Sequence, residues 1–445
     1  MEYAKIKVNY EQPKIWRRPE LDKLPEHGKT YNSVLKDKEE FDKVREGCRK
    51  EIKENYDKAL DKSETLGDLN RHISELSDFY GKAVIPTDEL DADFLLSKTN
   101  KNTLAKKLQG WCQNLVYNIP NIIDSKPYND LVNKFEGVPA FVCLAGPSLQ
   151  NNMHALKRAK GKSLIIAVDT SLRPLLEAGI VPDICVTHDA NPNGCKFFLS
   201  KDHPLNAHNV NLNNQSDLQL AHALLAMKSD KERLDYKYDT IGLFVNYCHP
   251  LTIEAYNGSE KRFYAVMDPS LPVYDCMAAC TNYKNDPEKG LIPENKGRII
   301  GGSSVGHVAE YVAIALGCNP ISFLGLDLSY PEGKTYVDGA SNQKDMKGQK
   351  LIDMPNLSGK KVPTNLSMLS YKMVFEKSFP QILGQKPELR FYNCTCDDKG
   401  NPAGILEVGA EPKPIDWVIE EFCKKEVDLQ WNKEKVKEDS LPSKT

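Results

Sequence analysis

Two short corners of the sequence combine glycine and serine in a way that favours the binding of an anion. At the first, the apolar run Ala140–Leu144 is followed by Gly146, Pro147 and Ser148, and a helix is predicted after them. Glycine lets a ligand approach the backbone, proline presets the first helical turn, and serine offers a hydroxyl group and a free N–H. A helix N-terminus also carries unpaired N–H groups and a partial positive charge. The first corner therefore predicts either a phosphate seat or an ordinary capped turn.

The second corner repeats this pattern farther along the chain. Gly302, Ser303 and Ser304 follow the short run Arg298–Ile300 and precede a helix predicted over Val305–Leu316. The first corner is not a P-loop, because no Gly-Lys-Ser/Thr follows, and it lacks the second and third glycines of a dinucleotide fingerprint. Two such helix ends in one sheet domain indicate a nucleotide or sugar-nucleotide cleft, provided that the fold brings them together.

Acidic residues close two further apolar runs. Asp169 follows Leu164–Val168 and Asp189 follows Ile184–Thr187, so both carboxylates are expected at the carboxyl ends of neighbouring strands. Such carboxylates can bind ribose hydroxyls, hold a divalent cation or cap the next helix. His188 beside Asp189 resembles the His-Asp pair of metal phosphohydrolases, but the other ligands of that pattern are missing. A divalent cation therefore stays open as a cofactor.

The loop after another predicted strand carries groups suited to a leaving phosphate. Asp327 ends the apolar stretch that begins at Ile321, and the next residues of interest are Tyr330, Lys334, Tyr336 and Asp338. Tyrosine hydroxyls and a lysine can stabilise negative charge on a phosphate, and a carboxylate or imidazole can accept a proton from an attacking hydroxyl. As general base we rank Asp338 first, then His307, then Asp327. The alternative is a solvated loop with one structural tyrosine.

The elements that must position these residues follow an alternating pattern. Most of the apolar runs are followed by a helix-like stretch, which predicts an α/β fold with a doubly wound, mainly parallel sheet. Ligands of such sheets bind beyond the carboxyl ends of the strands. We predict a helical N-terminal region over 1–137, the sheet domain over 138–410, and a short C-terminal helix with a disordered tail over 411–445. The runs are Ala140–Leu144, Ser163–Val168, Asp183–Thr187, Thr240–Asn246, Arg298–Ile300 and Ile321–Leu324.

The overall composition excludes some partners. The net charge of -3 sets 59 Lys and Arg against 62 Asp and Glu, so no basic field is available to hold nucleic acid or an anionic membrane. No stretch reaches the roughly 18 apolar residues that a membrane span needs, and a cytoplasmic location is expected. The 12 cysteines are interpreted as reduced thiols, because the close pairs Cys276/Cys280 and Cys394/Cys396 lack the second half of a zinc site.

Longer stretches of the chain resemble the motility-associated factor (Maf) glycosyltransferases of bacteria. This resemblance implies a Rossmann-like transferase core, related to bacterial sialyltransferases and to the archaeal-type hydroxymethylpterin pyrophosphokinase (MptE-like) domain. It also implies a CMP-activated nonulosonic acid as donor, namely sialic, pseudaminic or legionaminic acid, and Ser or Thr hydroxyls of flagellin as acceptor. The matching stretches run in order from about Cys143 to Ile405 and read "LAGPSL", "IIAVDTSLRPLLEAGIVPDICVTHDANP", "GGSSVGHVAEYVAIALGCNPISFLGLDLSYPEGKT", "VPTNLSMLSYKMVFEKSF" and "RFYNCTCDDKGNPAGI".

The resemblance assigns roles to the residues singled out above. Gly146, Pro147 and Ser148 would hold the phosphate and ribose of CMP, Asp169 and Asp189 would line the nucleotide pocket, and Gly302, Ser303 and Ser304 would face the donor. Asp327 and the loop from Tyr330 to Asp338 would flank the reacting carbon.

The sequence also departs from the related patterns. Sialyltransferases tend to have Asn at the positions of Asp169 and Asp189, which leaves the use of a divalent cation open. Many Maf proteins read Gly-Lys-Thr-His where this chain has Tyr336, so the usual candidate base is absent there.

The function predicted from these features is transfer of a nonulosonic acid from a CMP-sugar to a protein hydroxyl. The first alternative is an Mg-ATP-dependent pterin pyrophosphokinase-like enzyme, for which the N-terminal region and the Tyr330–Ala340 loop are unneeded. The second is a non-catalytic flagellin-binding assembly factor, because a fold does not fix a function. The particular sugar, the acceptor and the number of subunits stay open, and a homo-oligomer is compatible with the sequence.

Overall fold

The structure is a computed structural model that describes residues 125–207, 240–256, 304–340 and 351–428, with parts of 110–122, 262–267, 298–299 and two positions near 221–225. All of these belong to one compact unit formed by Leu90–Asp268 and Ile292–Thr445. Several predictions lie outside the described residues: residues 1–109 of the helical N-terminal region, the turn residues Gly302 and Ser303, the pair Cys276/Cys280, and the tail after 428.

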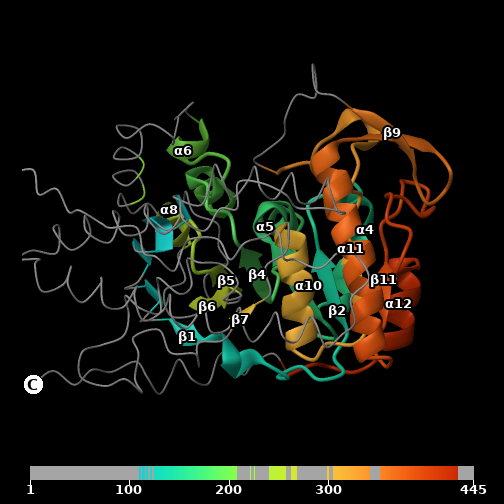
Figure 1. Ribbon diagram of the computed structural model, residues 1–445, viewed down its shortest axis with the longest axis horizontal. Helices are drawn as coiled ribbons and strands as arrows, with labels where there is room; N and C mark the ends of the chain where they lie inside the picture. Colours follow the sequence, from blue (N-terminus) through green and yellow to red (C-terminus); the bar gives the residue numbers. More distant parts are fainter. Residues whose placement is uncertain are drawn as a thin grey trace, which may run out of the picture. The chain divides into compact units, whose positions relative to one another are not determined.

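A ten-stranded sheet is the frame of the described part of the chain (Figure 1). Every described pairing in this sheet is parallel, and the central strands are buried along their whole length, which explains their uninterrupted apolar sequences. The predicted doubly wound α/β fold is confirmed. In spatial order the strands are β1 (Lys126–Pro127), β6 (Arg262–Met267), β5 (Ile241–Val245), β4 (Ile184–Thr187), β3 (Leu164–Val168), β2 (Ala140–Cys143), β8 (Ile321–Leu324), β11 (Phe391–Asn393) and β12 (Glu411–Pro412), and β7 (Arg298–Ile299) pairs with β6.

The order of the strands reverses between β2 and β8. From β2 the chain continues through β3, β4, β5 and β6 on one side, whereas β8 leads to β11 and β12 on the other. The register places Cys143 opposite Leu324, so the turns that follow these two strands leave the sheet side by side. Such a reversal opens a crevice beyond the carboxyl ends of the strands, and this is where ligands of open α/β sheets bind.

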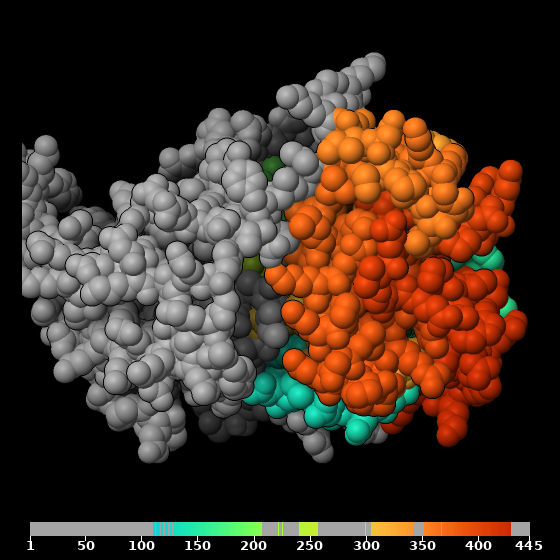
Figure 2. Space-filling view, turned by 45° about the vertical axis from the view of Figure 1, so that its right-hand side comes forward, coloured from blue at the N-terminus to red at the C-terminus, as the bar shows by residue number. Residues whose placement is uncertain are grey.

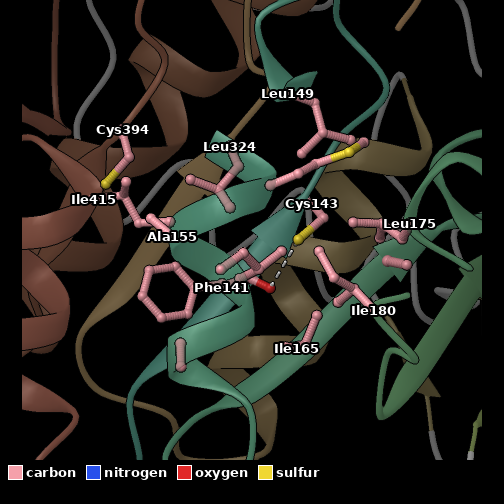
Figure 3. Packing of buried hydrophobic residues seen from close by; sticks show 14 of the residues in the cluster. Phe141, Cys143, Leu149, Ala155, Ile165, Leu175, Ile180, Leu324, Cys394 and Ile415 are labelled. Carbon is pink, nitrogen blue, oxygen red and sulfur yellow. Dashed lines mark hydrogen bonds between the residues drawn. The ribbon is translucent and has the colours of Figure 1, made fainter. Parts of the chain in front are cut away.

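Helices cover both faces of the sheet. On one face α4 (Leu149–Ala159), α5 (Asp169–Glu177) and α12 (Ile415–Phe422) bury a cluster that includes Phe141, Cys143, Ile165 and Leu324 (Figure 3). On the other face lie α10 (Val305–Ala315) and α11 (Leu366–Gln385), where Phe323 of β8 packs against Phe375 and Phe379 of α11. The alternation of side chains along β8 separates the two layers, because Leu324 points to one and Phe323 to the other.

Shorter elements complete the described part. They are η3 (Tyr128–Leu131), η4 (Pro192–Phe198), α6 (Pro204–Ala207), α8 (Pro250–Ala255), η8 (Pro331–Gly333) and a two-stranded hairpin of β9 (Ile352–Pro355) and β10 (Lys361–Thr364). The hairpin stands beside the start of α11, and the chain from the hairpin to α12 forms a continuous orange-to-red surface in Figure 2. No helix within the described ranges has the length and apolar character that a membrane crossing requires. The described cysteines, including Cys394 and Cys396, are free thiols.

Candidate functional site

The first corner binds a carboxylate of the protein itself. The hydroxyl group of Ser148 donates to Asp327 Oδ2 at 2.8 Å, and the backbone N–H of Ser148 donates to the same oxygen at 3.2 Å. A Cβ atom at Gly146 would lie 2.1 Å from that oxygen and 2.4 Å from the carbonyl oxygen of Gly325, so no larger residue fits. The glycine and serine that predicted a phosphate seat thus serve the contact between β2 and β8 at the reversal of the sheet.

Asp327 is held in place from a third direction. Its backbone carbonyl accepts a hydrogen bond from the N–H of Ile405, and the hydroxyl of Thr395 accepts one from the N–H of Leu326. The carboxyl group is 2% exposed, and burial raises its pKa to about 6 although both donors of Ser148 lower it. The segment from Thr395 to Ile405 therefore fixes the end of β8, where Asp327 lies.

The carboxylates of Asp169 and Asp189 lie together at the ends of β3 and β4. Asp169 is the first residue of α5; Oδ1 accepts hydrogen bonds from the N–H and hydroxyl of Thr170, and Oδ2 accepts one from the hydroxyl of Thr187. Burial raises the pKa of Asp169 to about 6, and the charge of Asp189 adds to this rise. Asp189 is partly exposed and accepts a hydrogen bond from the N–H of Asn191 at 2.8 Å.

Tyr336 and Tyr371 lie close enough to these carboxylates for the negative charges to raise the pKa of their phenols. Burial raises the pKa of Tyr336 to about 12, and Tyr330, Tyr371, Asp169 and Asp189 contribute to the rise. The pKa of Tyr371 is raised by burial and by Asp189. These phenols are therefore protonated hydrogen-bond donors at neutral pH. Of these two, the sequence did not predict Tyr371, because nothing in a helical segment shows which of its faces meets a site.

The loop that carries Tyr330 and Tyr336 packs against the carboxyl end of β2. Val337 donates its N–H to the carbonyl of Ala145, and Arg173 of α5 donates from Nε to the carbonyl of Gly339 at 2.8 Å. The hydroxyl of Tyr330 accepts a hydrogen bond from Asn365, the residue whose side chain caps α11. This loop therefore connects α5, β2 and α11 around the predicted site.

Asp338, ranked first as general base, lies on the outer side of this loop. Its side chain is 65% exposed and forms an ion pair with Lys334, at 3.1 Å between Nζ and Oδ2. The structure therefore places this carboxylate in solvent and does not bring it together with the buried carboxylates.

The start of α10 brings Ser304 and His307 to the same edge of the sheet. Gly306 lies against Leu144, since a Cβ atom there would be 3.2 Å from the Cδ2 atom of Leu144. The His307 ring stacks on Phe375 with 3.8 Å between ring centroids, and its Nδ1 lies 2.8 Å from the hydroxyl oxygen of Ser304. Burial lowers the pKa of His307 to about 3, so this imidazole is neutral.

His188, at the end of β4, is the residue whose surroundings differ most from the prediction. Its Nδ1 is buried and has no hydrogen-bond partner in the described part of the chain. Burial lowers the pKa of His188, and the charge of Asp189 opposes this effect. Its ring is 6.4 Å from that of Tyr247, and Trp111 stacks on Tyr247 at 4.9 Å. In the sequence, the signal that drew attention to His188 was its position directly before Asp189.

Two asparagines before the predicted sheet domain bind the loops at the strand ends: Asn114 joins the loops after β4 and β5, and Asn118 binds the loop after β5 alone. Asn114 Nδ2 donates to the carbonyls of Ala190 at 3.0 Å and Tyr247 at 3.1 Å. Asn118 Nδ2 donates to the carbonyls of Asn246 at 3.0 Å and Cys248 at 2.7 Å. Both side chains are buried, so residues from the predicted N-terminal region fix the backbone that follows Asp189 and the backbone that follows β5.

The described residues do not fit a resident metal ion. No group of three or more His, Cys, Asp or Glu side chains within the described ranges is arranged to hold one. The carboxylate oxygens of Asp169 are engaged by Thr170 and Thr187, and Oδ2 of Asp327 is engaged by Ser148. The sequence left a divalent cation open as a cofactor, and no step of the proposed reaction is assigned to such a cation.

Residues 113–219 match the family model described as 6-hydroxymethylpterin diphosphokinase MptE-like. This segment is therefore similar to the MptE-like family. The relationship to the MptE-like domain that was predicted from the sequence is thereby confirmed for the stretch that holds Ser148, Asp169, His188 and Asp189. Asp327 and the tyrosine loop lie beyond the matched residues.

Among solved structures, the chain is similar to the Maf glycosyltransferase from Magnetospirillum magneticum AMB-1. The sequences are 15% identical, the TM-score is 0.43, and the match covers 78% of this chain and 47% of that chain. This chain therefore spans about half the length of that protein. A likeness at this level carries no argument about activity. The search of curated proteins found no match.

Proposed function

We propose that this protein is a glycosyltransferase that moves a nonulosonic acid from a CMP-sugar to Ser or Thr hydroxyls of a protein, with flagellin as the expected acceptor. The observation that carries the proposal is the gathering of Asp169, Asp189, Tyr336 and Tyr371 beyond the carboxyl ends of the strands, next to the reversal of strand order. The collinear sequence stretches that resemble Maf proteins support the same class of reaction. A cytoplasmic location and a role in motility belong to this proposal.

The carboxylate and the phenols of this site are expected to bind different parts of the donor. Asp189 is partly exposed, and its carboxylate is suited to accept hydrogen bonds from ribose hydroxyls. The phenols of Tyr336 and Tyr371 keep their protons because their pKa values are raised, so they can donate to the phosphate oxygens of the departing CMP. Each oriented donor of this kind contributes on the order of 10²-fold in rate.

The reaction is a displacement at the anomeric carbon. The acceptor oxygen forms a bond to that carbon, the bond from the carbon to the phosphate oxygen breaks, and its electron pair stays on the phosphate of CMP. The proton of the acceptor hydroxyl passes to a base. Of the three bases predicted from the sequence, Asp338 is paired with Lys334 in solvent, His307 is stacked on Phe375, and Asp327 accepts from Ser148.

The test is the intact mass of flagellin from the same organism, co-expressed with the parent chain or with variants. The parent is expected to add mass in increments of one nonulosonic acid. Tyr336→Phe is expected to lower modification by about 10²-fold in rate while leaving the fold intact. Tyr392→Phe, which removes a buried phenol beside Trp417 and Phe422 of α12, is the matched control. Flagellin of unchanged mass with the parent chain, in a cell that makes the sugar, would remove the proposal.

The second candidate is transfer of a diphosphoryl group from Mg-ATP to the hydroxyl of a pterin alcohol. The match of residues 113–219 to a model described by that activity favours it. Thermal melting separates the two candidates. The glycosyltransferase is expected to be stabilised by CMP and CMP-sugars, whereas the kinase is expected to be stabilised by Mg-ATP and to release AMP when the pterin alcohol is added.

A further inference from the structure

His188 differs from three other described histidines in how its Nδ1 atom is used. In His203 and His249 this atom accepts a hydrogen bond from the backbone N–H of Leu205 and Leu251, respectively, and in His307 it lies 2.8 Å from the hydroxyl of Ser304. The Nδ1 atom of His188 is buried and has no partner within the described residues. A buried polar atom without a partner is costly, and a ligand or a reaction is one reason for a native protein to keep it.

The charges around His188 suit a group that accepts a proton and releases it again. Burial disfavours the imidazolium form, so the ring is neutral and has a free lone pair at the working pH. The adjacent carboxylate of Asp189 favours the imidazolium that forms when a proton arrives. A neutral histidine beside a carboxylate charge is suited to general base catalysis.

The described residues of the neighbouring elements bring acidic and neutral groups to this position. Asp189 follows on the same strand, Tyr247 and Cys248 follow β5, Asp169 follows β3, and the neutral His307 lies at the start of α10. A phosphate bound directly at His188 would meet the carboxylate of Asp189, whereas a neutral hydroxyl group would meet an imidazole that can take its proton. The environment therefore favours the acceptor hydroxyl and disfavours the leaving phosphate as the partner of His188.

We propose that His188 is the general base of the transfer reaction and that the negative charge of Asp189 stabilises the imidazolium that forms. This inference rests on the proposed glycosyltransferase function. As the acceptor oxygen bonds to the anomeric carbon and the carbon–phosphate oxygen bond breaks, the hydroxyl proton moves to the imidazole of His188. The imidazolium then returns the proton to solvent after CMP has left.

The experiment measures CMP release by the full chain with flagellin as acceptor, supplying CMP-sialic, CMP-pseudaminic and CMP-legionaminic acid in separate reactions. With the donor that the parent uses, His188→Asn is expected to lower kcat by about 10²- to 10⁴-fold. Its affinity for CMP, measured by calorimetry, is expected to stay within about 3-fold of the parent, since the base does not bind the phosphate. His154→Asn, on the exposed side of α4, is the matched control and is expected to keep the parent kcat.

A second variant protects the test against a simple folding defect. Asp189→Asn keeps an oxygen that can accept from Asn191 but removes the charge beside His188. The acidic limb of the kcat/KM profile is expected to move to lower pH in this variant and to vanish in His188→Asn. An unchanged kcat in His188→Asn, or an acidic limb that stays in place in both variants, would overturn the proposal. If the parent releases CMP from none of the three donors, the glycosyltransferase function itself falls, and the two failures are thereby distinguished.

Discussion

The corner at Gly146–Ser148 and the strand ends at Asp169 and Asp189 both predict a ligand site in the sequence. They differ in which of their polar groups are already bonded within the protein. At the corner, both donors of Ser148 are matched by the carboxylate of Asp327. At the strand ends, Asp189 is partly exposed, the phenols of Tyr336 and Tyr371 keep their protons, and His188 has a nitrogen without a partner among the described residues. The difference teaches that a glycine-serine turn before a helix can be a structural joint, while the reactive groups lie on the neighbouring strands.

Replacing Gly146 by alanine gives the largest expected effect and tests whether the corner is a joint. The new Cβ would lie 2.1 Å from Asp327 Oδ2, so the end of β8 must shift and the contact with Ser148 is lost. Overpacking and the lost charged hydrogen bond together predict a loss of about 3 kcal/mol in the free energy of unfolding, measured with urea.

Gly384→Ala is the control for this prediction. Gly384 lies in α11, and no described atom outside its own helical turn lies within 4 Å of the position that the alanine methyl group would take. Helix propensity therefore predicts a gain of up to about 1 kcal/mol in the free energy of unfolding. Equal effects of the two substitutions would mean that the corner is not tightly packed.

The pH dependence of stability tests the carboxyl group of the joint. The folded pKa of Asp327 is raised from 3.8 to about 6, so its contribution is fully present below about pH 4 and is lost as the pH rises through about 6. At about 1.4 kcal/mol per pKa unit, this single group is expected to lower the free energy of unfolding by about 3 kcal/mol between about pH 4 and pH 7.

Asp327→Asn is expected to flatten that decline, and Asp169, whose pKa is also raised to about 6, is expected to supply the part that is left. Urea unfolding at several pH values across this range makes the measurement, with Asp338→Asn as the exposed control. A profile of equal slope in Asp327→Asn and the parent would contradict the prediction.

A smaller effect is expected where the N-terminal segment holds the strand ends. Asn114→Ala leaves the carbonyls of Ala190 and Tyr247 without their shared donor, which predicts a loss of about 1–3 kcal/mol in the free energy of unfolding. The exposed neighbour Gln113→Ala is the control. CMP is also expected to stabilise the parent against unfolding. If this stabilisation is lost in Asn114→Ala but kept in Gln113→Ala, the strand ends take part in nucleotide binding.

The smallest effect is expected at the surface of the tyrosine loop. The ion pair of Lys334 with Asp338 is exposed on both sides, so Lys334→Ala is expected to change the free energy of unfolding by less than about 1 kcal/mol. The same substitution is expected to leave CMP binding unchanged, measured by calorimetry. A clear loss of CMP affinity would show that the outer side of the loop belongs to the site after all.

The strands were predictable because burial on both faces leaves an unbroken apolar run. Ala140–Leu144 and Ile321–Leu324 were predicted, and the strands are Ala140–Cys143 and Ile321–Leu324; the helix expected over Val305–Leu316 ends at Ala315. The β9–β10 hairpin was not predicted, because its residues are largely exposed and carry no clear alternation.

The site was predictable residue by residue but not in its connections. Carboxylates at strand ends follow from the alternating pattern, whereas the pairing of Ser148 with Asp327 depends on the register between two strands that are far apart in the chain. Tyr371 was missed for the same reason, since the angle of α11 about its axis decides what it faces. Local sequence patterns specify the helices and strands, whereas long-range packing decides which polar groups find a hydrogen-bond partner within the protein.

The hydrogen bond between Ser148 and Asp327 joins residues 179 positions apart, and the edge of β2 stays open until β8 has been synthesised. Parallel pairings over such distances close slowly, because a long loop must be ordered before any contact forms. During translation, the strands from β2 to β6 are therefore made before β8, and the backbone edge of β2 that will pair with β8 is exposed in the meantime. We expect newly made chains to be most prone to aggregation in that interval, and chaperones to matter most there.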